Sequence, residues 1–172
     1  MKTNVLLISP EKLRGVTTMS ENLDDCYIQP CIVDAQLVGL QSVIGTPLYD
    51  KLCSLVEGNT LNEPKNSVYK EFVDVYVECY LVYQTQVEMV VQSMSRQHNA
   101  GNVSYIDTSY QHTPTTNVKY LKDYYSNKAS FFAERMIDFL HQHSDMIPEW
   151  KSSTYQLQGD DRANTYRCGI KL

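Results

Sequence analysis

The sequence predicts a mainly α protein: an antiparallel helical bundle of about four helices, two of them long. Four segments repeat apolar residues every three to four positions, which is the spacing of one helix face. Only 7 of the 172 residues are glycine, which disfavours a turn-rich β-sandwich. With 42% hydrophobic residues the chain can form a core, so it is not a disordered chain. We expect an N-terminal arm (1–20), a helical domain (21–150) and a C-terminal tail (151–172).

The arm is expected to be extended. Residues 5–8 fit a short strand, and Pro10 and Gly15 break any regular structure after it. These residues have no periodic apolar face of their own, so we expect them to lie on another surface.

The first two helices have clear boundary signals. The first is expected to begin near residues 20–25, where acidic side chains favour a helix start, and to end at Gly45. Pro30 marks either a kink or the true first turn. A short second helix follows, with Thr46 as its cap and Pro47 at its first position, and it closes at residues 58–59.

The third helix, from about 65 to 97, carries the main argument. At about 1.5 Å per residue it is roughly 50 Å long, whereas a domain of this size should be roughly 40 Å across. The stretch 68–94 is apolar on several faces, more than a small chain can bury unaided, so we expect assembly with other subunits. One face is assigned to the intramolecular core: Phe72, Tyr76, Cys79, Tyr83, Val87 and Val90.

The C-terminal half is predicted with less pattern. A long insert loop at 98–116 has room for a weak hairpin, and loops of this length are usually functional or disordered. The fourth helix is expected from about 116 to 144. In the tail, residues 166–172 fit a strand-like segment. The apolar stripe of the fourth helix consists of Leu121, Tyr125, Phe132, Met136, Phe139 and Leu140.

No motif for catalysis or cofactor binding is present, so we predict no enzymatic activity, no cofactor and no metal. His141 and His143 cannot chelate together on a helix, because residues two apart point in nearly opposite directions. The five cysteines are odd in number and widely spaced, which favours reduced thiols. Carboxylates are scattered singly, so an unrecognised enzyme remains the third and weakest hypothesis.

The charge and the tyrosines limit the possible partners. A net charge of −5 argues against a general nucleic-acid binder. Base stacking needs cations among the aromatics, and around Tyr76, Tyr80 and Tyr83 there are none, so packing or subunit contact explains these rings better. No run approaches the roughly 20 apolar residues of a membrane span, so we expect no membrane partner.

The segment 23–52 contains a recognisable set of residues: Asp24, Asp25, Ile28, Pro30, Ile32, Ala35, Gln36, Leu40, Ile44, Gly45, Pro47, Leu48, Tyr49 and Leu52. With these residues the segment resembles the opening helix pair of head-to-tail connector (adaptor) proteins of tailed bacteriophages. Together with the residues preceding it (7–9), it is most similar to the ring proteins of crAss-like phages. Pro30 and the insert at 98–116 depart from the family pattern.

The resemblance implies a structural virion protein, made in the host cytoplasm and located at the head-to-tail interface. Such proteins form a ring, typically a dodecamer, that binds the portal protein and the next ring or tail protein. Genomic double-stranded DNA passes through the lumen without sequence-specific binding, and a mildly acidic chain suits a lumen that must not hold DNA.

A different class of function stays open: a small cytoplasmic helical module or regulator that binds a protein partner. The mass of the purified protein distinguishes a ring from a stable dimer. For the ring, we predict a subunit or portal interface formed by Leu7, Ile8, Tyr49, Tyr80, Val91, Tyr105, Tyr110, Trp150, Tyr155 and Tyr166.

Overall fold

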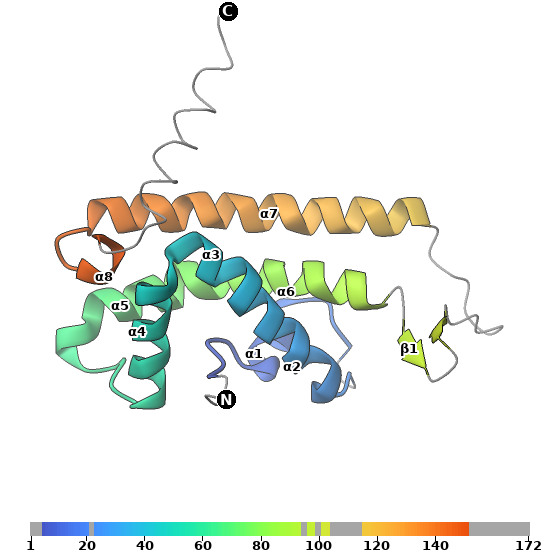
Figure 1. The fold of residues 1–172 in the computed structure, drawn as a ribbon, viewed down its shortest axis with the longest axis horizontal. Coiled ribbons are helices and arrows are strands. Elements are labelled where there is room, and N and C mark those ends of the chain that lie inside the picture. The colour runs from blue at the N-terminus through green and yellow to red at the C-terminus, as the bar shows by residue number, and fades with distance from the viewer. Residues whose placement is uncertain (1–4, 21–22, 94–95, 99–100, 104–114, 152–172) are drawn as a thin grey trace, which may run out of the picture.

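The computed structural model describes residues 5–20, 23–93, 96–98, 101–103 and 115–151, and this part of the chain is mainly helical, as predicted (Figure 1). The elements, in chain order, are α1 (Pro10–Val16), α2 (Asp25–Asp34), the π-helix η1 (Ala35–Leu40), α3 (Gln41–Ile44), α4 (Thr46–Glu57), the 3₁₀ helix η2 (Pro64–Asn66), α5 (Ser67–Glu71), the π-helix η3 (Phe72–Val77), α6 (Glu78–Ser93), β1 (Arg96–His98), β2 (Gly101–Val103), α7 (Thr115–Gln142) and α8 (Pro148–Lys151).

The N-terminal segment is partly helical, which corrects the prediction of an extended arm. Pro10 begins α1 at a position where proline is tolerated, because the missing N–H would have no helical partner there. The Ser9 hydroxyl accepts a hydrogen bond from the Lys12 backbone N–H at 3.1 Å and caps the helix. Leu13 is fully buried. The segment therefore packs on its own chain.

Gln36 holds the start of this segment from within η1. Its side-chain oxygen accepts from the Leu7 N–H at 2.8 Å, and its amide nitrogen donates to the Val5 carbonyl at 2.9 Å. The amide therefore binds the backbone of this segment twice, once as acceptor and once as donor. Because Gln36 is buried, these bonds satisfy a group that would otherwise cost free energy.

The first predicted helix is one continuous run through α2, η1 and α3. Asp24 caps it, with its carboxylate accepting from the Cys26 N–H at 3.1 Å. Pro30 lies inside α2 and not in its first turn, so the second of the two interpretations of this proline is excluded. Gly45 ends the run with φ of 81°, a conformation that favours glycine.

Gly45 also begins the next helix. Its carbonyl accepts from the Tyr49 N–H at 3.1 Å, so Gly45 and not Thr46 is the cap of α4. The Thr46 hydroxyl instead accepts from the Gln41 side chain at 2.9 Å. One glycine thus makes the sharp corner between two helices.

The third predicted helix is a continuous run through α5, η3 and α6 and ends earlier than expected. It stops at Ser93, and β1 pairs antiparallel with β2, placing Arg96 opposite Val103. A hairpin therefore lies at the start of the predicted insert. The chain reverses direction between α6 and α7, and α7 runs back along α6 in the opposite direction (Figure 1).

Stacked rings join the two long helices. The ring centroids of Phe72 and Phe139 are 5.5 Å apart, those of Tyr76 and Phe139 are 4.8 Å apart, and those of Tyr83 and Phe132 are 5.5 Å apart. Such pairs add to the stability gained from burial. The expected core face of the third helix is therefore confirmed for these three residues.

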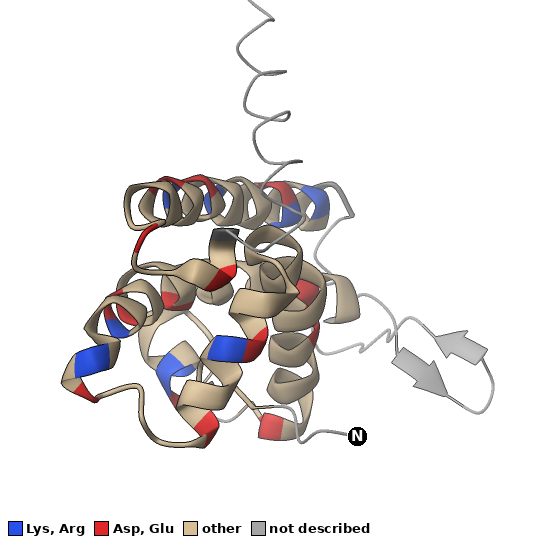
Figure 2. Ribbon diagram, turned by 60° about the vertical axis from the view of Figure 1, so that its left-hand side comes forward, with Lys and Arg blue, Asp and Glu red and all other residues tan. Residues whose placement is uncertain are grey.

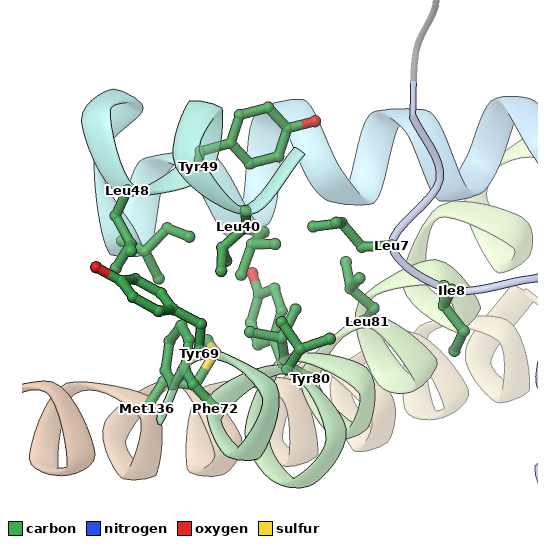
Figure 3. Packing of buried hydrophobic residues seen from close by; sticks show 14 of the residues in the cluster. Leu7, Ile8, Leu40, Leu48, Tyr49, Tyr69, Phe72, Tyr80, Leu81 and Met136 are labelled. Carbon is green, nitrogen blue, oxygen red and sulfur yellow. The ribbon is translucent and has the colours of Figure 1, made fainter. Parts of the chain in front are cut away.

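The core lies between this helix pair and the layer formed by α2, η1, α3 and α4. In Figure 3, Leu40 and Leu48 from that layer point toward Tyr69, Phe72 and Tyr80. Leu7 and Ile8 enter between the two layers from the N-terminal segment. The helix pair, the layer from α2 to α4 and the N-terminal segment thus share one hydrophobic core, which lets a small chain bury more apolar surface.

Candidate interaction surfaces

Five of the predicted interface residues are buried within their own chain, which corrects that prediction. Each is at most 8% exposed, so little of its side chain is left for a neighbouring subunit. Their rings and methyl groups already contact the core described above. These residues are Leu7, Ile8, Tyr49, Tyr80 and Trp150.

Two of the five have specific partners that explain their burial. The Tyr49 hydroxyl accepts a hydrogen bond from the Gln36 amide at 3.3 Å, on the same amide that holds the N-terminal segment. Trp150 lies edge-on to His141 at 5.9 Å between ring centroids, and α8 packs on α4. A third contact supports α8: the Tyr69 hydroxyl donates to Glu149 at 2.7 Å.

Of the other predicted interface residues, Val91 has a partly exposed side chain, at 42%. Tyr105, Tyr110, Tyr155 and Tyr166 lie outside the described residues. The strand-like segment predicted at 166–172 lies outside them as well.

A row of aromatic and basic side chains, which we name the α7 stripe, lies along the outer side of α7. Its members follow one another at steps of four, four, three and four residues, so they share one helix face. Tyr120 is 69% exposed and Phe131 is 54% exposed. The stripe consists of Tyr120, Tyr124, Lys128, Phe131 and Arg135.

Cations lie over rings along this stripe. The Lys128 ammonium nitrogen is 4.4 Å from the Tyr124 ring centroid and 4.9 Å from that of Tyr83. The Arg135 guanidinium is 5.8 Å from both the Phe131 and Tyr76 centroids. These contacts are cation–π interactions, which orient the charged groups over the rings. A hydrogen bond with Tyr124 is the main reason that the pKa of Lys128 is raised, so the ammonium stays charged.

A second surface, which we name the η1 patch, combines apolar and acidic side chains: Asp34, Leu37, Val38 and Glu88. Val38 is 70% exposed, and Leu37 beside it is exposed as well. The Asp34 carboxylate accepts from Gln92 at 3.3 Å, and Glu88 accepts from Gln84 at 3.0 Å. The row Gln84, Glu88 and Gln92 therefore follows the seam where α2 and η1 lie against α6.

The thiol of Cys31 shows that the two carboxylates of the patch converge. Burial is the main cause that raises the pKa of Cys31 to about 11, and the charges of Asp34 and Glu88 raise it further. Burial also raises the pKa of Cys79. Raised values keep these thiols protonated near pH 7, which does not suit a nucleophile.

The two surfaces lie on different sides of the same helix run. The α7 stripe contacts Tyr76 and Tyr83, whereas η1 approaches Tyr80 and Gln84. At about 100° per residue, Gln84 is turned about 100° from Tyr83, and Tyr80 is turned about 60° from it. The two surfaces therefore flank neighbouring sides of this helix run.

The parts of the chain that form the two surfaces also differ in how many cations they contain. Across residues 15–50 and 71–93 there is no lysine or arginine, while residues 115–128 contain three lysines and one aspartate. Figure 2 shows both basic and acidic residues on α7 and on the helices beneath it. The chain has a net charge of −5, so its positive region is local.

Sequence reasoning missed both surfaces. Leu121, expected in the core stripe of the fourth helix, is partly exposed, while Tyr120 and Phe131 were not assigned to any face. The spacing of Tyr120, Tyr124 and Lys128 was the available signal, because it is a helical repeat of its own. For η1, the adjacent apolar pair Leu37 and Val38 carries no local signal that separates an exposed position from a buried one.

Within the described residues, no three or more His, Cys, Asp or Glu side chains are grouped so as to hold a metal ion. A search of the same residues found no helix long and apolar enough to cross a membrane.

Comparison with known proteins identifies a family. No curated protein and no solved structure matched the chain. A family model described as a family of unknown function (DUF6712) matches residues 40–158, from the end of η1 through α8 and beyond. Because this match spans more than half of the sequence, the chain belongs to the DUF6712 family.

Proposed function

We propose that this chain is a structural virion protein that forms an oligomeric ring at the head-to-tail interface of a tailed bacteriophage. The ring, with twelve subunits as the expected number, links the portal protein to the next ring or tail protein. Genomic double-stranded DNA passes through its lumen. Each subunit of the ring is an antiparallel helical bundle, and its interaction surfaces lie on the outside of the bundle.

The single observation that carries the proposal is the pair of exposed surfaces on different sides of one long helix run. A closed ring needs a heterologous interface, in which one patch of each subunit meets a different patch of the next. The α7 stripe and the η1 patch meet this requirement, because neither is covered in the single chain. Exposed apolar clusters with polar surroundings commonly mark protein interfaces.

The local fold of the segment 23–52 adds support. The sequence resemblance to connector proteins rests on a helix, a glycine corner and a short second helix. The run from α2 to α3, the corner at Gly45 and the helix α4 have this arrangement. The segment also contains three of the four residues of the η1 patch, Asp34, Leu37 and Val38, so the resemblance and most of the patch lie in the same segment.

The acidic balance of the chain agrees with a conduit role. A lumen that attracted every phosphate would raise the barrier to sliding of the DNA. The long cation-free stretches in α2, η1, η3 and α6 would offer no such attraction.

Mass measurement on the purified full-length chain tests the proposal. We expect rings, or monomers that form rings when the portal protein is added, in native mass spectrometry and negative-stain images. A chain that never assembles, even with its virion partners, contradicts the ring. A stable dimer of fixed mass, unchanged by the portal protein, would instead favour the helical interaction module.

A further inference from the structure

We propose that the α7 stripe of one copy docks onto the η1 patch of the next copy. This inference rests on the proposed ring and identifies the two surfaces that join its subunits. The occupant of each surface is thus a second copy of the same chain.

Charge complementarity is the first argument. The stripe brings the positive charges of Lys128 and Arg135. The η1 patch brings Asp34 and Glu88, in a region of the chain without any lysine or arginine. Opposite potentials on two patches favour their encounter and fix the register in which they meet.

Apolar complementarity is the second argument. Exposed Tyr120, Tyr124 and Phe131 present flat rings, and exposed Leu37 and Val38 present branched aliphatic groups. Aromatic anchors at the centre of a contact usually supply most of its free energy, while charges lie around them. Both patches have this composition, so their contact would bury rings on methyl groups and leave the ions paired at the edge.

The arrangement of the surfaces is the third argument. They lie on different sides of α6, as the separate partners Tyr83 and Gln84 show. A copy that uses its stripe therefore keeps its patch free for another copy, which is the condition for a chain of contacts that closes into a ring. A twofold dimer built on the stripe alone would instead bring two like-charged stripes together, and these would repel.

A charge-swap experiment on the full-length chain tests the contact. The first variant, Lys128→Glu with Arg135→Glu, makes the stripe acidic. The second variant, Asp34→Lys with Glu88→Lys, makes the patch basic. A matched control, Lys65→Glu with Lys70→Glu, changes the net charge as the first variant does, at exposed positions distant in sequence from both surfaces. Circular dichroism melts establish that each variant is folded.

We expect each swapped variant alone to assemble at least about tenfold more weakly than the wild type, because like charges then face each other. An equimolar mixture should assemble to within about threefold of the wild type, since both contacts are attractive again. Native masses should then show the two variants in equal numbers. The control should assemble like the wild type.

Four outcomes overturn the inference, and they are distinguishable. Wild-type rings with unaffected swapped variants reject this contact but keep the proposed ring. Loss in each variant without recovery in the mixture rejects the pairing of these two surfaces. Binding of a random-sequence DNA duplex that the first variant loses, with assembly unchanged, assigns the stripe to nucleic acid. A wild type that never assembles with virion partners rejects the ring itself.

Discussion

Gly39 of η1 lies directly against the Tyr80 side chain of α6. A Cβ atom at position 39 would lie 2.7 Å from the Tyr80 hydroxyl oxygen and 2.9 Å from a Gln84 side-chain carbon. Only glycine leaves this space, which brings η1 against α6 and buries Tyr80. The η1 patch takes its position on the surface from this close contact.

The substitution Gly39→Ala tests that contact. Overpacking costs about 1–3 kcal/mol, offset by up to about 1 kcal/mol from the better helix propensity of alanine. We expect a net loss of unfolding free energy that shrinks by about 1 kcal/mol or more when Tyr80→Phe removes the hydroxyl. Urea denaturation of the wild type, the two single variants and the double variant measures the coupling energy between positions 39 and 80. Gly15→Ala is the control, since no atom lies within 4 Å of a Cβ there, and it should not destabilise.

The amide of Gln36 should hold the N-terminal segment. Gln36→Leu removes the bonds to the Leu7 N–H and the Val5 carbonyl and leaves buried backbone groups unpaired. We expect a loss of about 2–4 kcal/mol and faster hydrogen exchange at the N–H of Leu7. Gln41→Leu, which breaks an exposed bond to Thr46, should cost less than about 0.5 kcal/mol. Equal losses in both variants would contradict the assigned role of Gln36.

Tyr80 should make stability sensitive to alkali. Burial raises the pKa of Tyr80 to about 12, from an ordinary value of 10.0. The folded chain therefore holds this proton more tightly than the unfolded chain does. The protonated Tyr80 hydroxyl therefore contributes fully to the free energy of unfolding below pH 10. This contribution, at most roughly 2–3 kcal/mol, is lost as pH rises from 10 to 12.

Denaturation curves between pH 9 and pH 12 measure this effect. Tyr80→Phe should reduce the decline, and part of it should remain because burial also raises the pKa of Tyr49 to about 12. Tyr120→Phe changes an exposed ring and should leave the profile unchanged. An identical decline with and without the Tyr80 hydroxyl would refute the assignment.

Two phenylalanines on α7 separate folding from assembly. Phe139 is buried against Phe72 and Tyr76, so Phe139→Ala should cost about 3–5 kcal/mol of unfolding free energy. Phe131 is exposed on the α7 stripe, so Phe131→Ala should cost less than about 0.5 kcal/mol. Subunit association, measured by sedimentation, should nevertheless weaken about tenfold in Phe131→Ala. Normal association in that variant would exclude its ring from the interface.

Apolar periodicity predicted the long helices well, but it did not predict the short helices next to them. The corners at Gly45 and Gly58 were found, because glycine and proline mark helix ends locally. The short helices α1 and α8 were missed, since one or two turns give no measurable apolar period. Pro10 was read as a breaker although it opens α1.

Tyr80 shows why the interface residues were wrongly assigned. A helix that is apolar on every side does not reveal which side its own chain covers. That depends on Gly39, which lies 41 positions earlier and lets η1 come close enough to bury the ring. Conversely, Leu37 and Val38 fit a core pattern but are exposed on the surface of the subunit. Such burial follows from tertiary packing and not from local spacing.

The location of this chain in purified virions tests the central claim most directly. Electron cryomicroscopy of the virions, with the chain fitted to the density, should place it in a ring between portal and tail. In that ring, α7 of each copy should face η1 of the next. Absence of this chain from the virion, or its presence elsewhere in the particle, would contradict the account.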